Sequence, residues 1–247
     1  MITRHHITLS LICSLIAGLA IVPWDLFLLI LLAAGTCIGV ILPDIQMKAP
    51  KRITALTPAW MITRFARLIC VPVICSSYRL IPGIDAPQCD KRLTHSVPGI
   101  LFMFLIIAGI QYGIVLFLGA SPQFASAPLL LAGILLGLCL HLAEDLCTRK
   151  GITPLYPFST LRLSGTIRPC DTRDGRIRQF SIQHGLVLAG FVGLRIAGLI
   201  SEREITLAAL LGLILCTGLM GICSSVKVAD DDEPQQVPPG GISGSAA

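Results

Sequence analysis

The chain has 247 residues, of which 54% are hydrophobic and only 13% are charged, and its formal net charge is +5. Soluble globular chains carry about 25% charged residues, so half that share cannot cover a compact soluble fold. The mean hydropathy of +0.81 agrees. Composition therefore excludes a disordered chain and an ordinary soluble nucleic-acid-binding module, and it predicts an all-α integral membrane protein.

Six apolar segments approach the roughly 17–25 residues that a transmembrane helix needs. They cover residues 7–22, 26–42, 97–119, 127–146, 181–200 and 204–223. Short turns, such as Pro23-Trp24-Asp25 and Ser201-Glu202-Arg203, divide them into hairpins. We predict a polytopic membrane domain over residues 1–228 with about six transmembrane helices in three hairpins, and a disordered acidic and Gly/Pro/Ser-rich tail over 229–247. The first segment should be a retained helix, because no small-residue cleavage site follows it.

Basic residues predict the orientation. Two long loops, 43–96 and 147–180, hold 15 of the 19 Lys and Arg residues. The positive-inside rule places both loops and both termini in the cytoplasm, in a multi-pass inner-membrane protein. Within the first loop, residues 60–69 fit an interfacial helix and a loop that is either solvated or re-entrant equally well. The basic loops reflect topology, so a nucleic-acid partner is not expected.

Ten cysteines occur without any C-x-x-C pair. Five of them fall in or beside apolar segments, including Cys13 and Cys216. We interpret them as free thiols that behave as small hydrophobic residues.

The most informative polar pattern is His141 followed by Asp145. A spacing of four places both side chains on one helix face, and imidazole and carboxylate are common ligands of zinc and similar ions. A hydrogen bond that only holds helices together is the alternative. The adjacent Glu144 is a candidate general base, a group that supports a ligand, or an exposed residue. His6, Asp44 and His95 lie near the same predicted membrane face, where a closed cluster would bind metal and activate water.

At these residues the chain resembles the YdjM-type membrane-bound metal-dependent hydrolases. The resemblance covers roughly residues 1–160, and its most specific part is an H-x-x-x-D-x-x-T-x-x-G pattern from His141 to Gly151. His6, Pro43-Asp44 and Thr94-His95-Ser96 match the shorter motifs. The resemblance implies a divalent metal, most simply zinc, bound by five residues: His6, Asp44, His95, His141 and Asp145. The family's likeness to phosphoesterases suggests a phosphate-containing or lipid-linked substrate, by analogy alone.

The chain also departs from the family pattern. Gln46 and Met47 stand where the family commonly has Asp and His, and Asp90-Lys91-Arg92 replaces His-Arg-Gly. Asp90 remains a candidate metal ligand or catalytic base beside Glu144, and Arg92 or Arg149 is a candidate for holding a phosphate oxygen. These departures allow a site with a single metal, or a protein that has lost activity.

Three functional hypotheses follow. The first is a metal-dependent hydrolase whose site lies at the cytoplasmic membrane interface. The second is a non-catalytic scaffold or regulator with a degenerate metal site. The third is a small transporter, which is less favoured because only Gln111 and Arg195 lie near mid-membrane depth. The sequence leaves the oligomeric state open.

Overall fold

The computed structural model describes residues 3–22, 25–47, 49, 57–84, 90–119, 126–171, 174–201 and 203–229. Its longer elements are α1 (Thr3–Ile21), α2 (Leu26–Ile41), α3 (Thr57–Phe65), α4 (Val71–Arg79), α5 (Val97–Leu118), α6 (Ala127–Leu146), α7 (Arg176–Ile196) and α8 (Ile205–Cys223). The π-helical turn η1 (Ala66–Cys70) joins α3 to α4, and the 3-10 turn η2 (Lys91–Leu93) precedes α5. The predicted turn residues Pro23, Trp24 and Glu202, and residues 230–247 of the predicted tail, lie outside the described residues.

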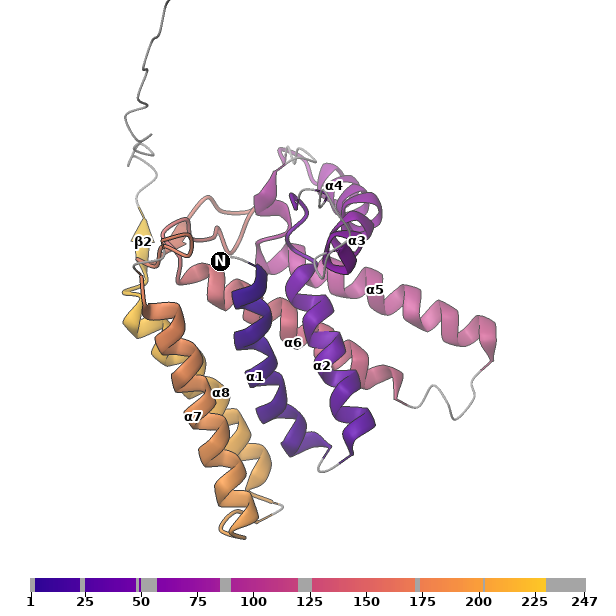
Figure 1. Ribbon diagram of the computed structural model, residues 1–247. Helices are drawn as coiled ribbons and strands as arrows, with labels where there is room; N and C mark the ends of the chain where they lie inside the picture. The colour runs from indigo at the N-terminus through magenta and orange to yellow at the C-terminus, as the bar shows by residue number, and fades with distance from the viewer. Residues whose placement is uncertain are drawn as a thin grey trace, which may run out of the picture.

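Helices dominate the described chain, which confirms the all-α membrane fold. The hairpin α1–α2 and the hairpin α7–α8 run side by side, whereas the axes of α5 and α6 are inclined to those of both hairpins (Figure 1). Asp25 begins α2 by accepting a hydrogen bond from the Leu28 amide, and Ser96 begins α5 by accepting one from Gly99. Such caps satisfy amides that have no partner within the helix.

The helices long and apolar enough to cross a membrane differ from the six predicted segments. Among the described residues there are five: Arg4–Ile21, Thr57–Arg79, Val97–Leu118, Ala127–Leu146 and Ile205–Cys223. The predicted segment 26–42 forms a shorter apolar helix. The predicted segment 181–200 forms part of α7, whose first half is too polar, because it contains Arg176, Arg178, Gln179, Gln183 and His184.

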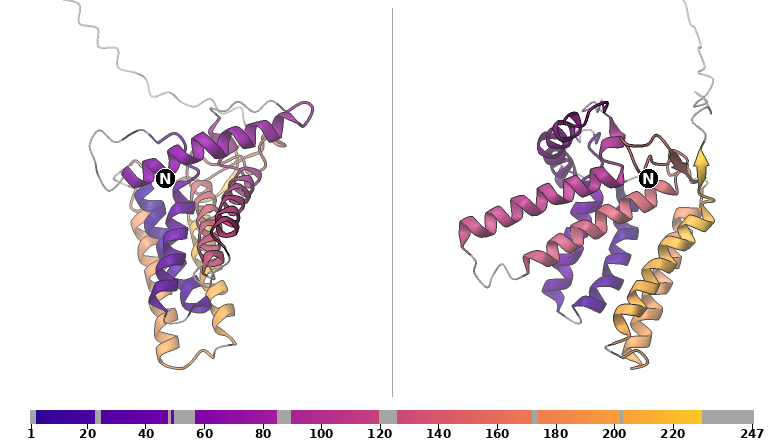
Figure 2. Two further views of the ribbon diagram at one scale, coloured as in Figure 1. Left: turned by 90° about the vertical axis from the view of Figure 1, so that its right-hand side faces the viewer. Right: turned by 180° about the vertical axis from the view of Figure 1, so that it is seen from behind.

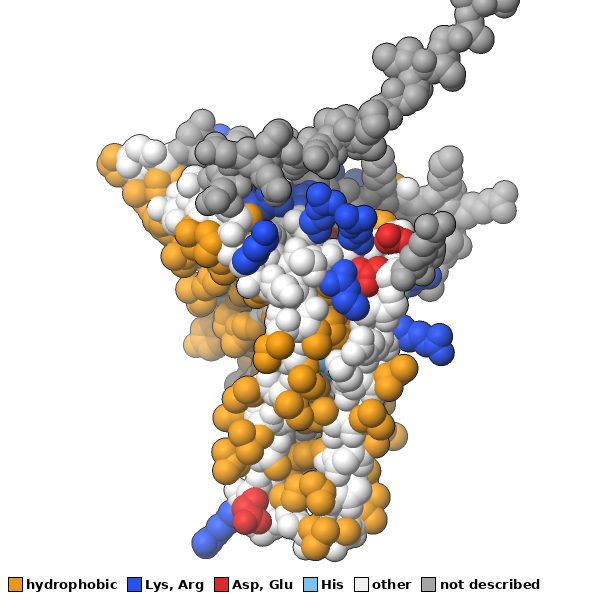
Figure 3. All heavy atoms as spheres, turned by 90° about the vertical axis from the view of Figure 1, so that its left-hand side faces the viewer, with side chains coloured by type: hydrophobic (Ala, Val, Ile, Leu, Met, Phe, Trp, Pro, Cys, Tyr) orange, Lys and Arg blue, Asp and Glu red, His pale blue; other side chains and the backbone are white. Residues whose placement is uncertain are grey.

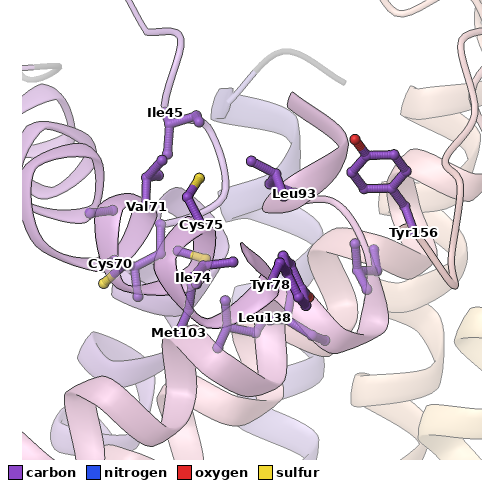
Figure 4. Packing of buried hydrophobic residues seen from close by; sticks show 14 of the residues in the cluster. Ile45, Cys70, Val71, Ile74, Cys75, Tyr78, Leu93, Met103, Leu138 and Tyr156 are labelled. Atoms are coloured by element: carbon purple, nitrogen blue, oxygen red, sulfur yellow. The ribbon is translucent and has the colours of Figure 1, made fainter. Parts of the chain in front are cut away.

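The segment Thr57–Arg79 decides between the two alternatives left open for residues 60–69: it is helical, and the helix extends beyond them on both sides. It is helical throughout and lies across the ends of α1 and α2 (Figure 2). One face, including Ala66, Ile74 and Tyr78, is buried in a core cluster with Leu93, Met103 and Leu138 (Figure 4). The other face exposes Met61, Leu68 and Val73 beside Arg64 and Arg67. An amphipathic helix of this kind suits a membrane interface.

Glycines bring α2 and α6 into backbone contact. A Cβ atom added at Gly35 or Gly39 of α2 would lie 2.3 Å from the Leu130 carbonyl or 2.1 Å from that of Ile134. On α6, Gly133 and Gly137 meet α2 just as closely. Both helices thus carry a G-x-x-x-G pattern at the contact, which is typical of tightly packed membrane helices. This packing places the end of α2 beside the last turns of α6.

The loop after α6 closes onto the C-terminal end of α8. Strand β1 (Arg162–Ser164) pairs antiparallel with β2 (Lys227–Ala229). Ala229 therefore belongs to a strand and not to the predicted disordered tail. Lys and Arg side chains gather at this end of the molecule, and apolar side chains cover the helical body below them (Figure 3).

Candidate metal centre

The five predicted metal ligands lie together at one end of the helices. His6 comes from the first turns of α1, Asp44 follows α2, His95 precedes α5, and His141 and Asp145 lie in the last turns of α6. His6, His95, His141 and Asp145 are buried, and Asp44 is half-buried. Two groups of donors could hold a metal ion, one formed by His6, His141 and Asp145 and one by Asp44, His95 and His141.

The donor atoms converge on His95 and Asp145. His95 Nε2 lies 3.2 Å from His141 Nε2, 3.8 Å from Asp44 Oδ1 and 3.5 Å from Asp145 Oδ2. Asp145 Oδ2 also lies 3.6 Å from His141 Nε2, as the four-residue spacing predicts. The other oxygen of Asp145 lies 3.3 Å from His6 Nε2. The imidazole planes of His6 and His141 stack with their centroids 4.4 Å apart.

Neighbouring groups orient two of the three imidazoles. His6 Nδ1 lies 2.6 Å from Glu144 Oε2, and His95 Nδ1 lies 3.2 Å from the Lys91 carbonyl. A ring that donates its Nδ1 proton to these acceptors leaves Nε2 as a lone-pair donor. In this tautomer, Nε2 of His6 and of His95 carries no proton, and both nitrogens face the cluster. Supporting bonds of this kind are typical of histidines that bind metals.

Glu144 is fully buried, which excludes the exposed alternative. Its Oε1 accepts a hydrogen bond from Ser10, and its Oε2 pairs with His6. Ser10 lies one turn after His6 on α1, so α6 holds α1 through two side chains at once. The sequence analysis missed Ser10, although its four-residue spacing from His6 is the signal that predicts a shared helix face.

The short motifs are joined by hydrogen bonds that position the cluster. Thr94 donates its hydroxyl to the Pro43 carbonyl, which ties the segment before α5 to the end of α2. After α6, Thr148 donates its hydroxyl to the Asp145 carbonyl and accepts from the Gly151 amide. Gly151 has a φ of +61°, and a Cβ there would lie 2.0 Å from the Leu163 carbonyl. Glycine is therefore required at the end of this motif.

Asp90 is paired with its own neighbour, Arg92. Its carboxylate accepts hydrogen bonds from the amide, Nε and terminal nitrogen of Arg92, and Arg92 also lies over the Tyr156 ring. Burial raises the pKa of Asp90, but the hydrogen bonds from Arg92 outweigh burial and lower it. Arg92 is thus engaged by Asp90 and Tyr156, and Arg149 is exposed.

Lys91 is the cation that lies beside the cluster, and the sequence analysis did not select it. Its Nζ lies 3.6 Å from Asp44 Oδ1 and 3.9 Å from Asp145 Oδ2. Burial raises the pKa of Asp44, but His95, His141 and Lys91 together hold it well below its usual value. Burial is also the main reason why the pKa of His95 is lowered. Asp44 is therefore ionised at neutral pH, and His95 is in the form that can bind a cation.

The two polar residues expected at mid-membrane depth bond to backbone carbonyls. Gln111 Nε2 donates to Ala127 across the α5–α6 hairpin, and Arg195 donates to Leu19 at the end of α1. Both contacts join helices, and neither residue belongs to the histidine–carboxylate cluster. They give no support to a polar path through the membrane.

Fold and site together define a helical membrane protein with a buried histidine and carboxylate cluster that could hold a metal ion. Residues 1–228 match the YdjM inner membrane protein family, and the chain belongs to that family. No curated protein and no solved structure matches the chain.

Proposed function

We propose that this protein is a membrane-bound metal-dependent hydrolase whose metal ion, most simply zinc, lies among His6, Asp44, His95, His141 and Asp145. The observation that carries the proposal is the 3.2 Å approach of His95 Nε2 to His141 Nε2, with carboxylate oxygens close by. Two ring nitrogens at this distance share either a proton, as a hydrogen bond, or a cation bound by both. The two carboxylates beside them, Asp44 and Asp145, supply the negative charge that a divalent cation needs.

The donor spacings suit a small tetrahedral ion. Zinc binds nitrogen and oxygen at roughly 2.0–2.2 Å, so two ligands of one tetrahedral ion lie about 3.4 Å apart. Four spacings within the cluster, between 3.2 and 3.8 Å, fall near that value. Three of the four residues Asp44, His95, His141 and Asp145 would bind the ion directly, which leaves the fourth tetrahedral position open for water. His6 either takes the place of one of them or holds the second oxygen of Asp145.

A divalent ion in this position would act as a Lewis acid and lower the pKa of bound water toward about 7. The protein's own residues would supply binding and orientation. Glu144 orients His6, and Lys91 provides a positive charge for a phosphate oxygen of the substrate. Asp90 is disfavoured as the base, because a carboxylate with a lowered pKa accepts a proton poorly.

An apolar cavity supports a lipid-linked substrate. It has a volume of about 600 Å³ and lies between α2, α3, α5 and α6. Leu42, which lines it, precedes Asp44 by two residues, and Ile134 lies two helical turns before His141 on the same face. A hydrocarbon chain in this cavity would lead to the cluster, where its phosphate group would meet Lys91 and the metal. The proposed substrate class is therefore a phosphoester of a membrane lipid.

The first test is the metal content of the purified protein in detergent, measured by elemental mass spectrometry with wild type beside a His141→Ala, Asp145→Ala double variant. We expect metal at this centre in the wild type and its loss in the double variant. His5→Ala is the matched control, because His5 is adjacent to His6 but is not part of the cluster. A wild-type protein that takes up no metal from an excess of zinc, manganese or iron would refute the metal centre.

The second test is phosphate release from phosphoester lipids in vesicles, compared with water-soluble phosphoesters. We expect turnover of the lipid substrates by the metal-loaded wild type and none by the double variant. A loaded protein that hydrolyses neither class would instead favour the scaffold or regulator hypothesis. Hydrolysis of the soluble esters alone would contradict the role of the apolar cavity.

A further inference from the structure

A second cluster of metal-binding side chains lies among three helices, apart from the histidine and carboxylate centre. Cys13 comes from α1, His184 from α7 and Cys216 from α8. One donor atom of each lies within 4.8 Å of the other two, and all three side chains are 1% exposed. We propose that this cluster is a structural binding site for a divalent cation such as zinc. The ligands are the two cysteine sulfurs and one ring nitrogen of His184.

His184 supplies the independent observation. Neither of its ring nitrogens makes a hydrogen bond of good geometry to the described residues, and the backbone of Phe180, one turn earlier in α7, offers the ring only a weaker polar contact. Burying a polar group without a partner is costly, and native proteins rarely leave one in this state. Ser14 and Gln183, the sequence neighbours of Cys13 and His184, also have a buried oxygen without a hydrogen bond. A cation bound by an imidazole nitrogen of His184 removes the cost for that ring.

Charge and ligand type select the cation. The cluster lies in an apolar core that includes Ile16, Leu140 and Phe191. A net charge is expensive there. The charge of −2 on two thiolates cancels the charge of a divalent ion, and the neutral imidazole adds none. A monovalent copper ion would leave one negative charge. Soft sulfur ligands disfavour magnesium and calcium. Binding of zinc therefore releases two protons, one from each cysteine thiol, and forms a neutral site.

The bound cation would fix α7 and α8 to α1. Cys13 lies two helical turns after His6, on the same face of α1 as His6 and Ser10. The sulfur site would thus hold the helix that carries His6 against its neighbours. It shares no ligand with the centre proposed for hydrolysis.

Cobalt substitution tests this site separately from the proposed function, because only a sulfur ligand gives strong sulfur-to-cobalt charge-transfer absorption in the near ultraviolet. The full-length protein is reduced, freed of reductant and titrated with Co²⁺ in detergent. We expect the absorption in the wild type and in the His141→Ala, Asp145→Ala variant. We expect its complete loss in a Cys13→Ser, Cys216→Ser variant, and retention in a Cys70→Ser, Cys75→Ser variant. Cys70 and Cys75 are equally buried, but in the core beside α4.

Alkylation gives a second readout that does not depend on the folding of a variant. In the wild type, zinc should slow the alkylation of Cys13 and Cys216 but leave the alkylation rate of exposed Cys139 unchanged. Peptide mass spectrometry identifies which cysteine is modified. The proposal is overturned if the wild type shows no charge-transfer absorption. It is also overturned if zinc protects neither cysteine, or if the absorption survives the loss of both.

Discussion

Glu144 connects two helices through both of its carboxylate oxygens. One accepts from Ser10 and the other lies 2.6 Å from His6 Nδ1. This geometry favours a positioning role, in which Glu144 fixes the direction of His6 Nε2 towards Asp145. A general base would instead need an oxygen directed at the substrate. Because the His6 ring is already fixed, less of its conformational entropy is lost when a metal ion binds.

We predict that Glu144→Gln lowers the affinity for zinc by about 10- to 100-fold, because such supporting bonds typically have effects of that size. The Gln variant keeps the volume and loses the charge. Competition with a chromophoric chelator measures the change. Glu204→Gln is the control, since Glu204 is exposed and its carboxylate accepts hydrogen bonds from the amide and hydroxyl of Ser201, away from the cluster. Equal affinities of Glu144→Gln and wild type would exclude the positioning role.

The pair Asp174 and Arg176 makes the stability depend on pH. The Arg176 guanidinium donates two hydrogen bonds to Asp174 and two more to Thr166, which attaches the loop to the start of α7. The hydrogen bond from Arg176 is the main reason why the pKa of Asp174 lies well below its usual value of 3.8. A carboxyl group with a lowered pKa in the folded state stabilises the fold above its unfolded pKa.

We therefore predict that Asp174→Asn lowers the thermal unfolding midpoint at neutral pH. The difference from wild type should shrink as the pH falls below about 4, where Asp174 becomes protonated in the unfolded chain. Thermal unfolding in detergent at a series of pH values measures it. Asp171→Asn is the nearby control. A difference that stays constant down to pH 2 would contradict the prediction.

At the scale of elements, the α2–α6 contact determines whether the ends of these helices meet. No side chain can be added at Gly39 without moving the Ile134 carbonyl, which would lie 2.1 Å from its Cβ. On α5, by contrast, a Cβ added at Gly113 meets no described atom within 4 Å. Two chemically identical substitutions therefore separate helix packing from helix propensity.

We expect Gly39→Ala to destabilise the protein by about 1–3 kcal/mol through overpacking, and also to weaken metal binding, because Asp44 follows α2. Gly113→Ala should be neutral or slightly stabilising, since alanine favours helix. Thermal unfolding and zinc affinity measure the two effects. If Gly39→Ala matched Gly113→Ala in both, the backbone contact would not determine the site.

The helix Thr57–Arg79 is long enough to cross a membrane, yet it lies across the ends of α1 and α2 (Figure 2). Its exposed apolar residues and arginines suit the interface between lipid headgroups and acyl chains. We propose that it lies in this interface. Trp60, in its first turn, is one of the two tryptophans of the chain.

In a Trp24→Phe variant, Trp60 should be the sole tryptophan reporting membrane depth. We expect bromine atoms placed near the lipid headgroups to quench its fluorescence more strongly than bromine atoms near the ends of the acyl chains. The Trp60→Phe variant, which retains Trp24, is the control for background. Stronger quenching from the chain ends would mean that this helix spans the bilayer.

At the scale of the whole molecule, the helix ends that carry the cluster share one side, where the Lys and Arg side chains also gather (Figures 1 and 3). We propose that this side faces the cytoplasm. A fluorescent protein that matures only in the cytoplasm, fused to either terminus, should then be bright. The same fluorescent protein, inserted beside Arg203 in the turn between α7 and α8, should be dark. A bright insertion with dark termini would reverse the orientation.

Sequence reasoning predicted the fold class well because long apolar segments are a strong signal. The meeting of His6, Asp44 and His95 with His141 was also predictable, since motif order and a common membrane side suggested it. Their role as metal ligands stays a prediction.

Other features had no local signal. Cys13, His184 and Cys216 come from distant helices without a ligand spacing, so only packing shows that they meet. By contrast, the crosswise helix had a partial signal: residues 60–69 fitted an interfacial helix, but Arg64 and Arg67 suited a solvated loop as well.

The backbone contact between α2 and α6 also bears on how the protein is made. Gly137 leaves the ribosome about 100 residues after Gly39, which takes about 5–20 s at ordinary rates of synthesis. During that interval α2 lacks the partner that fits its glycine face. His141 and Asp145 are also translated after the other members of the cluster. Metal loading of the proposed centre would therefore have to follow the synthesis of α6, and a chain stalled earlier contains an incomplete cluster.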